Sequence, residues 1–340
     1  MQRIASIGRP SIQLEGLKKS FRRALPRESG IASRVMDLLS PRLQAVQAIA
    51  DVSFRIEPGE RVAFIGPNGA GKSTTLKVLS GILEPDAGTV DVLGMVPWRE
   101  RTRLAFAIGT VFGQRSQLWY QLPAKDSLEL LGHVYELSRS EYQRRLAQLT
   151  EAFDLGAILG TPVRQLSLGQ RMRCELAASL LHAPRVLFLD EPTIGLDAVA
   201  KASIRELLQH RSREEGATLL LTSHDTGDIE KVCERVIVIH GGRVLFDAPI
   251  GELKRRYLSL RRVTVSTEKA ELELELPGAT RVHAEPHRTT YQLDERETSL
   301  GRLVDCITRQ TSLRDLEIDD PPLEEVVRRL YADADRGAPS

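Results

Sequence analysis

The stretch Gly66-Pro-Asn-Gly-Ala-Gly-Lys-Ser73 decides the fold, because it matches the pattern GxxxxGK[ST] in full. A short apolar run, Arg61-Val-Ala-Phe-Ile-Gly66, leads into it, and the residues from Lys72 to Ser80 have a helical pattern. Glycines let the backbone wrap closely, so that successive N–H groups and the first turn of the helix face phosphate oxygens. The sequence therefore predicts a phosphate-binding loop between a strand and a helix. Its predicted lining residues are Gly66, Pro67, Asn68, Gly69, Ala70, Gly71, Lys72, Ser73 and Thr74.

Two side chains of this loop and two acids further along the chain carry the predicted chemistry. Lys72 is expected to reach the β- and γ-phosphates, and the hydroxyl of Ser73 is expected to ligate Mg²⁺. Such a site needs an acid to complete the metal coordination, and Asp190 ends a second apolar run, Arg185-Val-Leu-Phe-Leu-Asp190. Glu191 follows directly, where it can polarise a water molecule for in-line attack on the γ-phosphate.

The remaining apolar runs predict an α/β fold around this loop. Ala217-Thr-Leu-Leu-Leu-Thr222 and the run that ends at Asp190 are nearly continuous, which is typical of parallel strands covered on both faces. Residues 235–240 and 243–246, joined by Gly241-Gly242, predict a hairpin with a glycine turn. Residues from about 98 to 182 have a mostly helical pattern and predict an inserted helical subdomain.

The character of the chain changes after about Tyr257. Glu271-Leu-Glu-Leu-Glu-Leu276 alternates strictly, which predicts a strand with one solvated face. Residues 298–309 and 322–332 have the pattern of short amphipathic helices. We therefore expect residues 258–335 to form a separate small α/β domain, which carries no recognisable chemistry.

Composition excludes several classes of protein. The 340 residues have a formal net charge of +1, which argues against a protein that coats nucleic acid. Cys174, Cys233 and Cys306 lie far apart, so they predict neither a disulfide framework nor a zinc site. No window approaches 18 consecutive apolar residues. These observations predict a soluble, cytosolic chain.

Further motifs around the loop carry a family resemblance. Leu166-Ser-Leu-Gly-Gln170 resembles the signature motif of ATP-binding cassette (ABC) ATPases, and it precedes the acid pair as it does in that family. Gln114 matches the Q-loop, Asp197 the D-loop and His224 the H-loop, all in the family's order. Five ordered motifs make the resemblance specific, and it covers residues from about 11 to 257. The fold that it implies is a P-loop NTPase with an ABC-type nucleotide-binding domain.

The resemblance also implies the roles of these residues and a dimer. ATP, with Mg²⁺, is held between the phosphate-binding loop of one copy and the signature motif of a second copy. Gln114 senses the metal and the γ-phosphate, with Ser73 and Asp190 as the other metal ligands, and His224 holds the γ-phosphate and orients Glu191. Residue 168 is leucine where the commonest family pattern has glycine. The residues expected to meet the partner's ATP are Ser167, Gly169, Gln170 and Asp197.

The adenine base has one candidate partner upstream of the loop. Phe21 matches the family's stacking position by its local pattern, although about two dozen extra residues separate it from Ala48. It either stacks on adenine or belongs to the core at the end of a strand. The extra residues, about 22–47, are basic, and Ile31, Val35, Leu38 and Leu39 predict a short helix within them. This insertion either packs on its own domain or contacts membrane subunits or anionic lipid.

Sequence features also indicate a branch of the family. Val111-Phe-Gly-Gln-Arg-Ser-Gln-Leu-Trp-Tyr120 resembles ABC-2-type exporters, including proteins described as viologen exporters. Leu118, Trp119 and Tyr120 either receive a helix of a membrane partner or form part of the subdomain core. The resemblance implies an ATP-hydrolysing motor subunit that drives separately encoded transmembrane permease subunits from the inner face of the cell membrane. The alternative is a soluble ABC ATPase that acts in translation or DNA maintenance.

Overall fold

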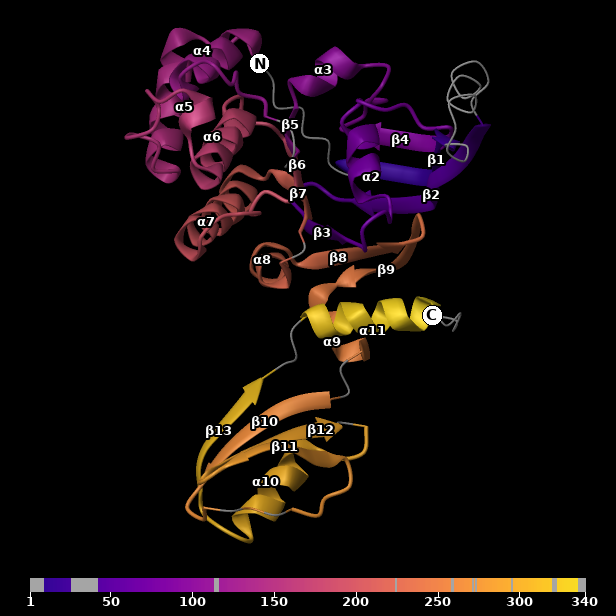
Figure 1. The fold of residues 1–340 in the computed structure, drawn as a ribbon, viewed down its shortest axis with the longest axis vertical. Helices are drawn as coiled ribbons and strands as arrows, with labels where there is room; N and C mark the ends of the chain where they lie inside the picture. The colour runs from indigo at the N-terminus through magenta and orange to yellow at the C-terminus, as the bar shows by residue number, and fades with distance from the viewer. Residues whose placement is uncertain are drawn as a thin grey trace, which may run out of the picture. The chain divides into compact units, whose positions relative to one another are not determined.

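The computed structural model describes residues 9–25, 42–112, 116–223, 225–257, 260–270, 272, 274–294, 296–319 and 323–335. The chain divides into two compact units, Met1–Ala248 and Pro249–Ser340 (Figure 1). This division falls slightly before the expected boundary at residue 257, so the helix that ends at Tyr257 belongs to the second unit.

A nine-stranded sheet forms the centre of the first unit, in the order β4-β1-β2-β9-β8-β3-β7-β6-β5. Its strands are β1 (Ile12–Leu25), β2 (Arg42–Ile56), β3 (Arg61–Ile65), β4 (Ala87–Val92), β5 (Ile108–Phe112), β6 (Val186–Asp190), β7 (Thr218–Thr222), β8 (Arg235–His240) and β9 (Arg243–Pro249). Its helices are α2 (Lys72–Leu79), α3 (Arg101–Ala105), α4 (Ala124–Val134), α5 (Arg139–Ala152), α6 (Leu168–Leu180), α7 (Ala198–Glu215) and α8 (Thr226–Val232).

The strands that were predicted from apolar runs form the parallel part of this sheet. Strand β3 pairs with β7 and β8, and β6 pairs with β5 and β7, all in parallel. Every residue of β3 and β7 is buried, as expected for strands covered on both faces. The predicted hairpin is also present, since Gly241 and Gly242 both have positive φ between β8 and β9. The mixed α/β fold predicted from the sequence is therefore confirmed.

The helical part of the first unit is narrower than the predicted range of 98–182. Helix α3 also lies within this range, but β5 separates it from α4, α5 and α6 and is the edge strand next to β6. The sequence of β5, Ile-Gly-Thr-Val-Phe, is too short to show an alternation of its own. The strand forms because β6 offers it a full parallel register from Ile108–Val186 to Phe112–Asp190.

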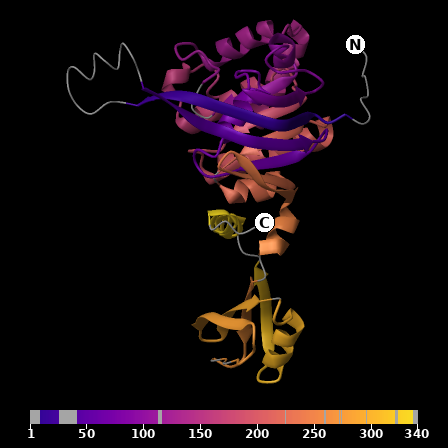
Figure 2. The ribbon, with the colours of Figure 1, turned by 90° about the vertical axis from the view of Figure 1, so that its right-hand side faces the viewer.

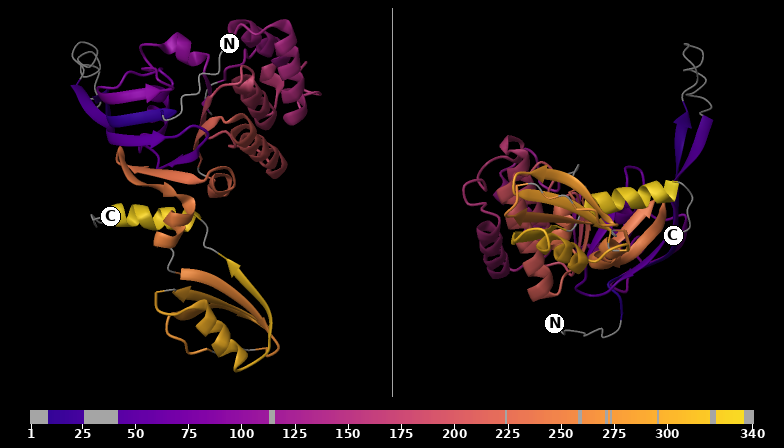
Figure 3. Two further views of the ribbon diagram at one scale, coloured as in Figure 1. Left: turned by 180° about the vertical axis from the view of Figure 1, so that it is seen from behind. Right: turned by 90° about the horizontal axis from the view of Figure 1, so that it is seen from below.

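Strands β1 and β2 form a two-stranded ribbon where a basic loop was expected. Their antiparallel pairing runs from Ile12–Ile56 to Leu25–Arg42, whereas the pairing of β1 with β4 ends at Lys18–Ala87. Figures 2 and 3 show the two strands continuing together past the edge of the sheet. Residues 22–25 and 42–47 of the expected insertion are therefore strand, and the expected helix over Ile31 to Leu39 lies outside the described residues.

The second unit is an α/β structure, as predicted. A four-stranded antiparallel sheet in the order β11-β12-β10-β13 packs against α10 through Val263, Tyr291, Leu303 and Ile307. Its strands are β10 (Leu260–Thr267), β11 (Ala279–Glu285), β12 (Arg288–Asp294) and β13 (Leu313–Asp319). Its helices are α9 (Ile250–Tyr257), α10 (Leu300–Thr308) and α11 (Leu323–Asp335). Helices α10 and α11 correspond to the two predicted amphipathic helices.

The strand predicted at residues 271–276 was wrong for the part that the structure describes. Residues 272 and 274–276 are not in a strand, and the first strand after β10 is β11. The leucines of this stretch still contact the core, where Leu272 is 2 % exposed and Leu274 and Leu276 pack beside it. The carbonyl of Leu272 accepts a hydrogen bond from the hydroxyl of Tyr291, at 3.1 Å. The alternation thus reflects burial of one face without pairing in a sheet.

No helix in the described part of the chain combines the length and the apolar character needed to cross a membrane.

Candidate nucleotide site

The predicted phosphate-binding loop lies between buried β3 and α2, as the sequence indicated. Gly71 precedes α2 with a φ of 106°, and Gly69 has a φ of 84°, conformations that favour glycine. A Cβ on Gly66 would lie 2.5 Å from the carbonyl oxygen of Ile239, and one on Gly71 would lie 2.6 Å from that of Ala48. Glycine is therefore required at these positions, because backbone carbonyl groups of β8 and β2 lie against the loop.

The ammonium of Lys72 lies inside this loop. Lys72 is 7 % exposed, and its Nζ donates to the carbonyl oxygens of Gly66 at 2.5 Å and Pro67 at 3.2 Å. Burial lowers the pKa of Lys72, while the nearby charges of Glu191 and Asp190 raise it. The loop, which carries the cation, and the end of β6, which carries the two acids, are therefore close in space although they are far apart in sequence.

The two acids at the end of β6 are held by one threonine that the sequence analysis did not single out. The hydroxyl of Thr222 on β7 donates to Oδ1 of Asp190 at 2.6 Å, and it accepts from the N–H of Glu191 at 3.2 Å. The carbonyl of Thr222 also accepts from the Glu191 N–H, at 3.1 Å. Glu191 has a φ of 56°, an uncommon conformation for a residue with a Cβ. Thr222 thus fixes the backbone where the predicted base leaves the strand.

The predicted signature residues surround the start of α6. Ser167 is the N-cap: its hydroxyl accepts from the Gln170 N–H at 3.2 Å, and the Gln170 side chain accepts from the Ser167 N–H at 2.9 Å. This reciprocal capping box stabilises the first turn of the helix. Leu168, which replaces the family's glycine, is 43 % exposed and lies against Gly195. The helix N-terminus and the Ser167 hydroxyl are suited to an anion.

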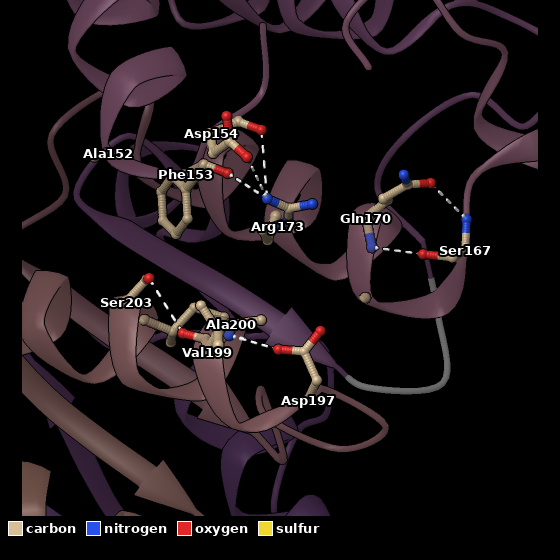
Figure 4. A pocket seen from close by; sticks show the side chains of 12 residues that line it. Ala152, Phe153, Asp154, Ser167, Gln170, Arg173, Asp197, Val199, Ala200 and Ser203 are labelled. Carbon is tan, nitrogen blue, oxygen red and sulfur yellow. Dashed lines mark hydrogen bonds and ion pairs between the residues drawn. The ribbon is translucent and has the colours of Figure 1, made fainter. Parts of the chain in front are cut away.

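A groove with a volume of about 410 Å³ joins the signature residues to the D-loop (Figure 4). Ser167, Gly169 and Gln170 line one part of it, and Asp197 lines another. The Asp197 carboxylate accepts from the N–H of Ala200 at 2.8 Å and so caps the start of α7. The structure therefore brings together all four residues expected to meet a partner's nucleotide.

The phosphate-binding loop and the signature motif are far from each other within the first unit. Figures 1 and 3 show α2, which follows the loop, and α6, which follows the signature motif, on opposite sides of β6 and β7. The two predicted halves of the nucleotide site therefore lie in separate places on one chain.

Phe21 lies on β1, next to the strand that contacts the phosphate-binding loop, and it does not belong to the core. It is 40 % exposed on β1 and pairs with the exposed Val46 on β2. Ala48, on the same face of β2 as Val46, is the residue whose carbonyl contacts the position of Gly71. Of the two alternatives for Phe21, core packing is thus wrong, and its exposed ring remains a candidate for adenine stacking.

Two predicted residues, Gln114 and His224, lie outside the described part of the chain. The neighbours of His224 are described: the Asp225 carboxylate caps α8 and pairs with Lys201 of α7, 2.5 Å away. Lys201 is not among the residues predicted from the sequence. Its signal is a lysine four residues after Asp197, at the spacing that places both near the start of one helix.

The chain is similar in sequence to known proteins that bind ATP. A family model described as ABC transporter matches residues 49–194. The ABC transporter ATP-binding protein NatA of Bacillus subtilis is 34% identical over 210 residues, which cover 62% of this chain and 85% of that relative. The daunorubicin resistance ATP-binding protein DrrA3 of Streptomyces coeruleorubidus is 34% identical over 297 residues, or 84% of this chain and 92% of the relative. The Nod factor export ATP-binding protein I of Neorhizobium galegae is 36% identical over 201 residues, or 59% and 57% of the two chains.

Solved structures give the same result. The ATP-binding subunit of an ABC transporter is similar with a TM-score of 0.61 and 26% identity, covering 72% of this chain and 92% of that one. A dimeric ATP-binding cassette in a post-hydrolysis state, bound to ADP and Pi, is similar with a TM-score of 0.59 and 26% identity, covering 70% and 98%. The ordered motifs, the two half-sites and these similarities establish that the chain belongs to the family of ABC transporter ATP-binding proteins, which are ATPases.

Proposed function

We propose that this chain is the ATP-hydrolysing motor subunit of an exporter and that it drives separately encoded membrane subunits by ATP-dependent dimer closure. The observation that carries the proposal is the meeting of Lys72 with Asp190 and Glu191 in one half-site, together with a second half-site at Ser167. A motor that closes around ATP needs both halves on each copy. The named roles of the relatives DrrA3 and the Nod factor export protein support export.

Glu191 is the proposed general base. Its carboxylate is close enough to Lys72 to act on the pKa of that ammonium, so it lies beside the place where a terminal phosphate meets Lys72. There it can take a proton from the attacking water. His224 and Gln114 are proposed to orient the γ-phosphate and the water, on the family resemblance alone. Phe21 is proposed to stack on adenine, because its exposed ring lies on the strand pair that backs the phosphate-binding loop.

The residues present fit Mg²⁺ as the metal. Ser73 is exposed at the start of α2. Asp190 accepts the hydrogen bond from Thr222 through Oδ1, so this bond leaves Oδ2 available for a metal. Hydroxyl and carboxylate oxygens are the ligands that Mg²⁺ prefers, and Gln114 is the third proposed ligand. When bound, Mg²⁺ supplies charge neutralisation to the β- and γ-phosphate oxygens.

The second half-site is proposed to receive ATP from another copy of this chain. The Ser167 hydroxyl accepts from the Gln170 N–H, so its proton can be donated to a phosphate oxygen. Gly169, Gln170 and Asp197 complete the groove. Because α2 and α6 lie on opposite sides of the central strands, a head-to-tail homodimer is the arrangement that lets both halves meet one nucleotide.

Contact with membrane subunits is proposed for the segment before α4. Leu118 is 4 % exposed and belongs to the core, whereas Trp119 and Tyr120 are 43 % and 51 % exposed. Exposed aromatic side chains next to each other are typical of an interaction surface. We place this contact at the cytoplasmic face of the membrane, where ATP is available, and we expect no nucleic-acid partner.

The test is the substitution Glu191→Gln, with Glu268→Gln, an exposed acid of the second unit, as the control. The variant should keep its affinity for ATP and lose turnover about 100-fold or more, since a general base contributes about 10²–10⁴-fold. With MgATP it should double in mass by light scattering, because the closed dimer no longer hydrolyses its nucleotide. Near-normal turnover in the variant would show that Glu191 is not the base.

A further inference from the structure

Glu175 is a buried acid that the proposed mechanism does not use. It lies on α6 and is 4 % exposed. Burial of a carboxylate is unfavourable unless hydrogen bonds replace water. Both of its oxygens accept hydrogen bonds from one segment: Oε1 from the Ser116 hydroxyl, and Oε2 from the Gln117 N–H at 2.9 Å. Burial raises the pKa of Glu175, and the donors from Ser116, Gln117 and Leu118 lower it in part.

The segment 116–120 is held on its other sides as well. The Gln117 side chain donates to the carbonyl of Thr110 on β5, at 2.5 Å. The Trp119 N–H donates to the hydroxyl of Ser127 on α4, at 3.1 Å. These bonds fix a short irregular stretch between the central sheet and the helical part of the unit, with Leu118 buried and Trp119 and Tyr120 exposed.

Helix α6 contacts this segment at two places on one face. Arg171 donates to the Tyr120 hydroxyl at 3.2 Å, and Glu175 lies four residues further along the helix. Residues four apart share a helix face. The same helix begins at Ser167, about 12 Å away from Glu175 at 1.5 Å per residue. Because its first turn is closed by the capping box, the helix can carry a displacement at Ser167 to Glu175 without bending.

We propose that Glu175 is a positioning residue that locks segment 116–120 to the signature helix, so that the exposed Trp119–Tyr120 surface moves with Ser167. The lock itself follows from the hydrogen bonds, whereas its use in transmitting ATP-driven closure rests on the proposed function. Only a carboxylate can serve both Ser116 and Gln117 as an acceptor through two oxygens. An amide offers one accepting oxygen and turns an NH₂ toward donors, and alanine offers none.

The first arm of the test measures the lock in the protein without nucleotide. The sequence has two tryptophans, so Trp98→Phe leaves Trp119, inside the segment, as the fluorescent reporter. In this background, Glu175→Ala and Glu175→Gln should raise the quenching of Trp119 by acrylamide and lower its anisotropy. The matched control is Ser179→Ala, because the buried Ser179 hydroxyl bonds within α6, to Leu176. Unchanged quenching in both Glu175 variants would overturn the proposal.

The second arm measures transmission, with Glu191→Gln added so that ATP is not consumed. MgATP should change the Trp119 emission of the parent, and Glu175→Gln should abolish that change while ATP affinity stays within about twofold. In chains with Glu191 intact, Glu175→Gln should lower kcat about tenfold at nearly constant KM, as expected when a positioned group is displaced. An emission change equal to that of the parent would overturn the proposal.

Failure of the proposed function and failure of the Glu175 lock can be told apart. If the parent itself does not bind ATP, the proposed function fails, and the first arm still decides the lock. If Glu175→Ala does not fold, Ser116→Ala replaces it, because this change removes the donor to Oε1 and leaves the buried acid bonded to Gln117. It should raise Trp119 quenching by less than the full loss of the carboxylate, and an unchanged value would count against the lock.

Discussion

The hydroxyl of Thr222 donates a 2.6 Å hydrogen bond to Oδ1 of Asp190, across neighbouring strands β7 and β6. The hydroxyl oxygen of Thr222 also accepts a hydrogen bond from the N–H of Glu191, whose φ of 56° bends the chain away from the strand. One fully buried side chain therefore sets the orientation of the proposed metal ligand and the direction of the proposed base. Outer groups that orient a metal ligand commonly affect metal affinity about 10–100-fold.

We predict that Thr222→Val strongly lowers the apparent affinity for Mg²⁺ and only slightly lowers the free energy of unfolding. Valine has nearly the same shape and lacks the hydroxyl, so Asp190 loses a donor and the free energy of unfolding falls by about 1 kcal/mol. The Mg²⁺ concentration for half-maximal ATP binding should rise about tenfold, with lower kcat. Thr222→Ser should restore both, and a Mg²⁺ dependence equal to that of the unmodified protein in Thr222→Val would contradict this role.

Lys72→Met should separate nucleotide binding from stability. Burial disfavours the charged form of Lys72, as its lowered pKa indicates, so a neutral side chain of similar length relieves a cost in the folded protein. ATP affinity should fall about tenfold or more, because a partly desolvated phosphate charge loses its partner. Urea unfolding should show a free energy equal to or above that of the unmodified protein. A large loss of stability would mean that Lys72 mainly supports the loop.

The parts of the fold that sequence reasoning predicted well are those where one local pattern has a single structural solution. The apolar runs that end at Gly66, Asp190 and Thr222 have strand length and are nearly continuous, which favours buried strands, and the glycine pattern of residues 66–73 matches the turn that was found. Residues 271–276 failed for the opposite reason. Alternation reports which face is buried, and Leu272 is buried by Tyr291 and its neighbours without a pairing strand.

The candidate site was predicted unevenly for a related reason. Motif residues such as Lys72 and Ser167 carry their chemistry in their spacing. Thr222 and Glu175 carry theirs in contacts between segments that are far apart in the chain, 32 residues in one case and 59 in the other. A threonine at a strand end and an acid in a helix have no distinctive local pattern, so only the fold reveals which groups they face.

The pair between Lys201 and Asp225 predicts a pH-dependent contribution to stability. The hydrogen bond from Lys201 lowers the pKa of Asp225 below its ordinary value of 3.8. Because the folded-state pKa is the lower one, this contribution is fully present above about pH 4 and is lost as pH falls through the folded value. Lys201→Met should therefore cost about 0.5 kcal/mol at pH 7, discounted for partial exposure.

The measurement for this pair is chemical unfolding followed by tryptophan fluorescence, since Trp98 and Trp119 both lie in the first unit. The difference between Lys201→Met and the unmodified protein should shrink between pH 7 and pH 3. Lys125→Met, at an exposed lysine of α4, is the control for loss of one positive charge. A difference that grows on acidification has the wrong sign for this linkage.

The contact between Leu168 and Gly195 leads to a prediction about the leucine in the signature motif. A Cβ on Gly195 would lie 2.3 Å from Cδ2 of Leu168, and the φ of Gly195 is 72°. Gly195→Ala therefore adds two costs: backbone strain of about 1 kcal/mol, and a displacement of Leu168 that disturbs the turn capped by Ser167. In the Glu191→Gln background, the ATP concentration for half-maximal dimerisation should rise.

The double variant Leu168→Ala with Gly195→Ala separates the two costs. It should dimerise more readily than Gly195→Ala alone, because the steric conflict is gone while the strain stays. Gly216→Ala is the matched control, since Gly216 has a φ of 69° and nothing within 4 Å of its Cβ position. It should lower stability and leave ATP-dependent dimerisation unchanged in light scattering. If the effects of Leu168→Ala and Gly195→Ala are simply additive, the leucine does not couple the signature motif to the D-loop.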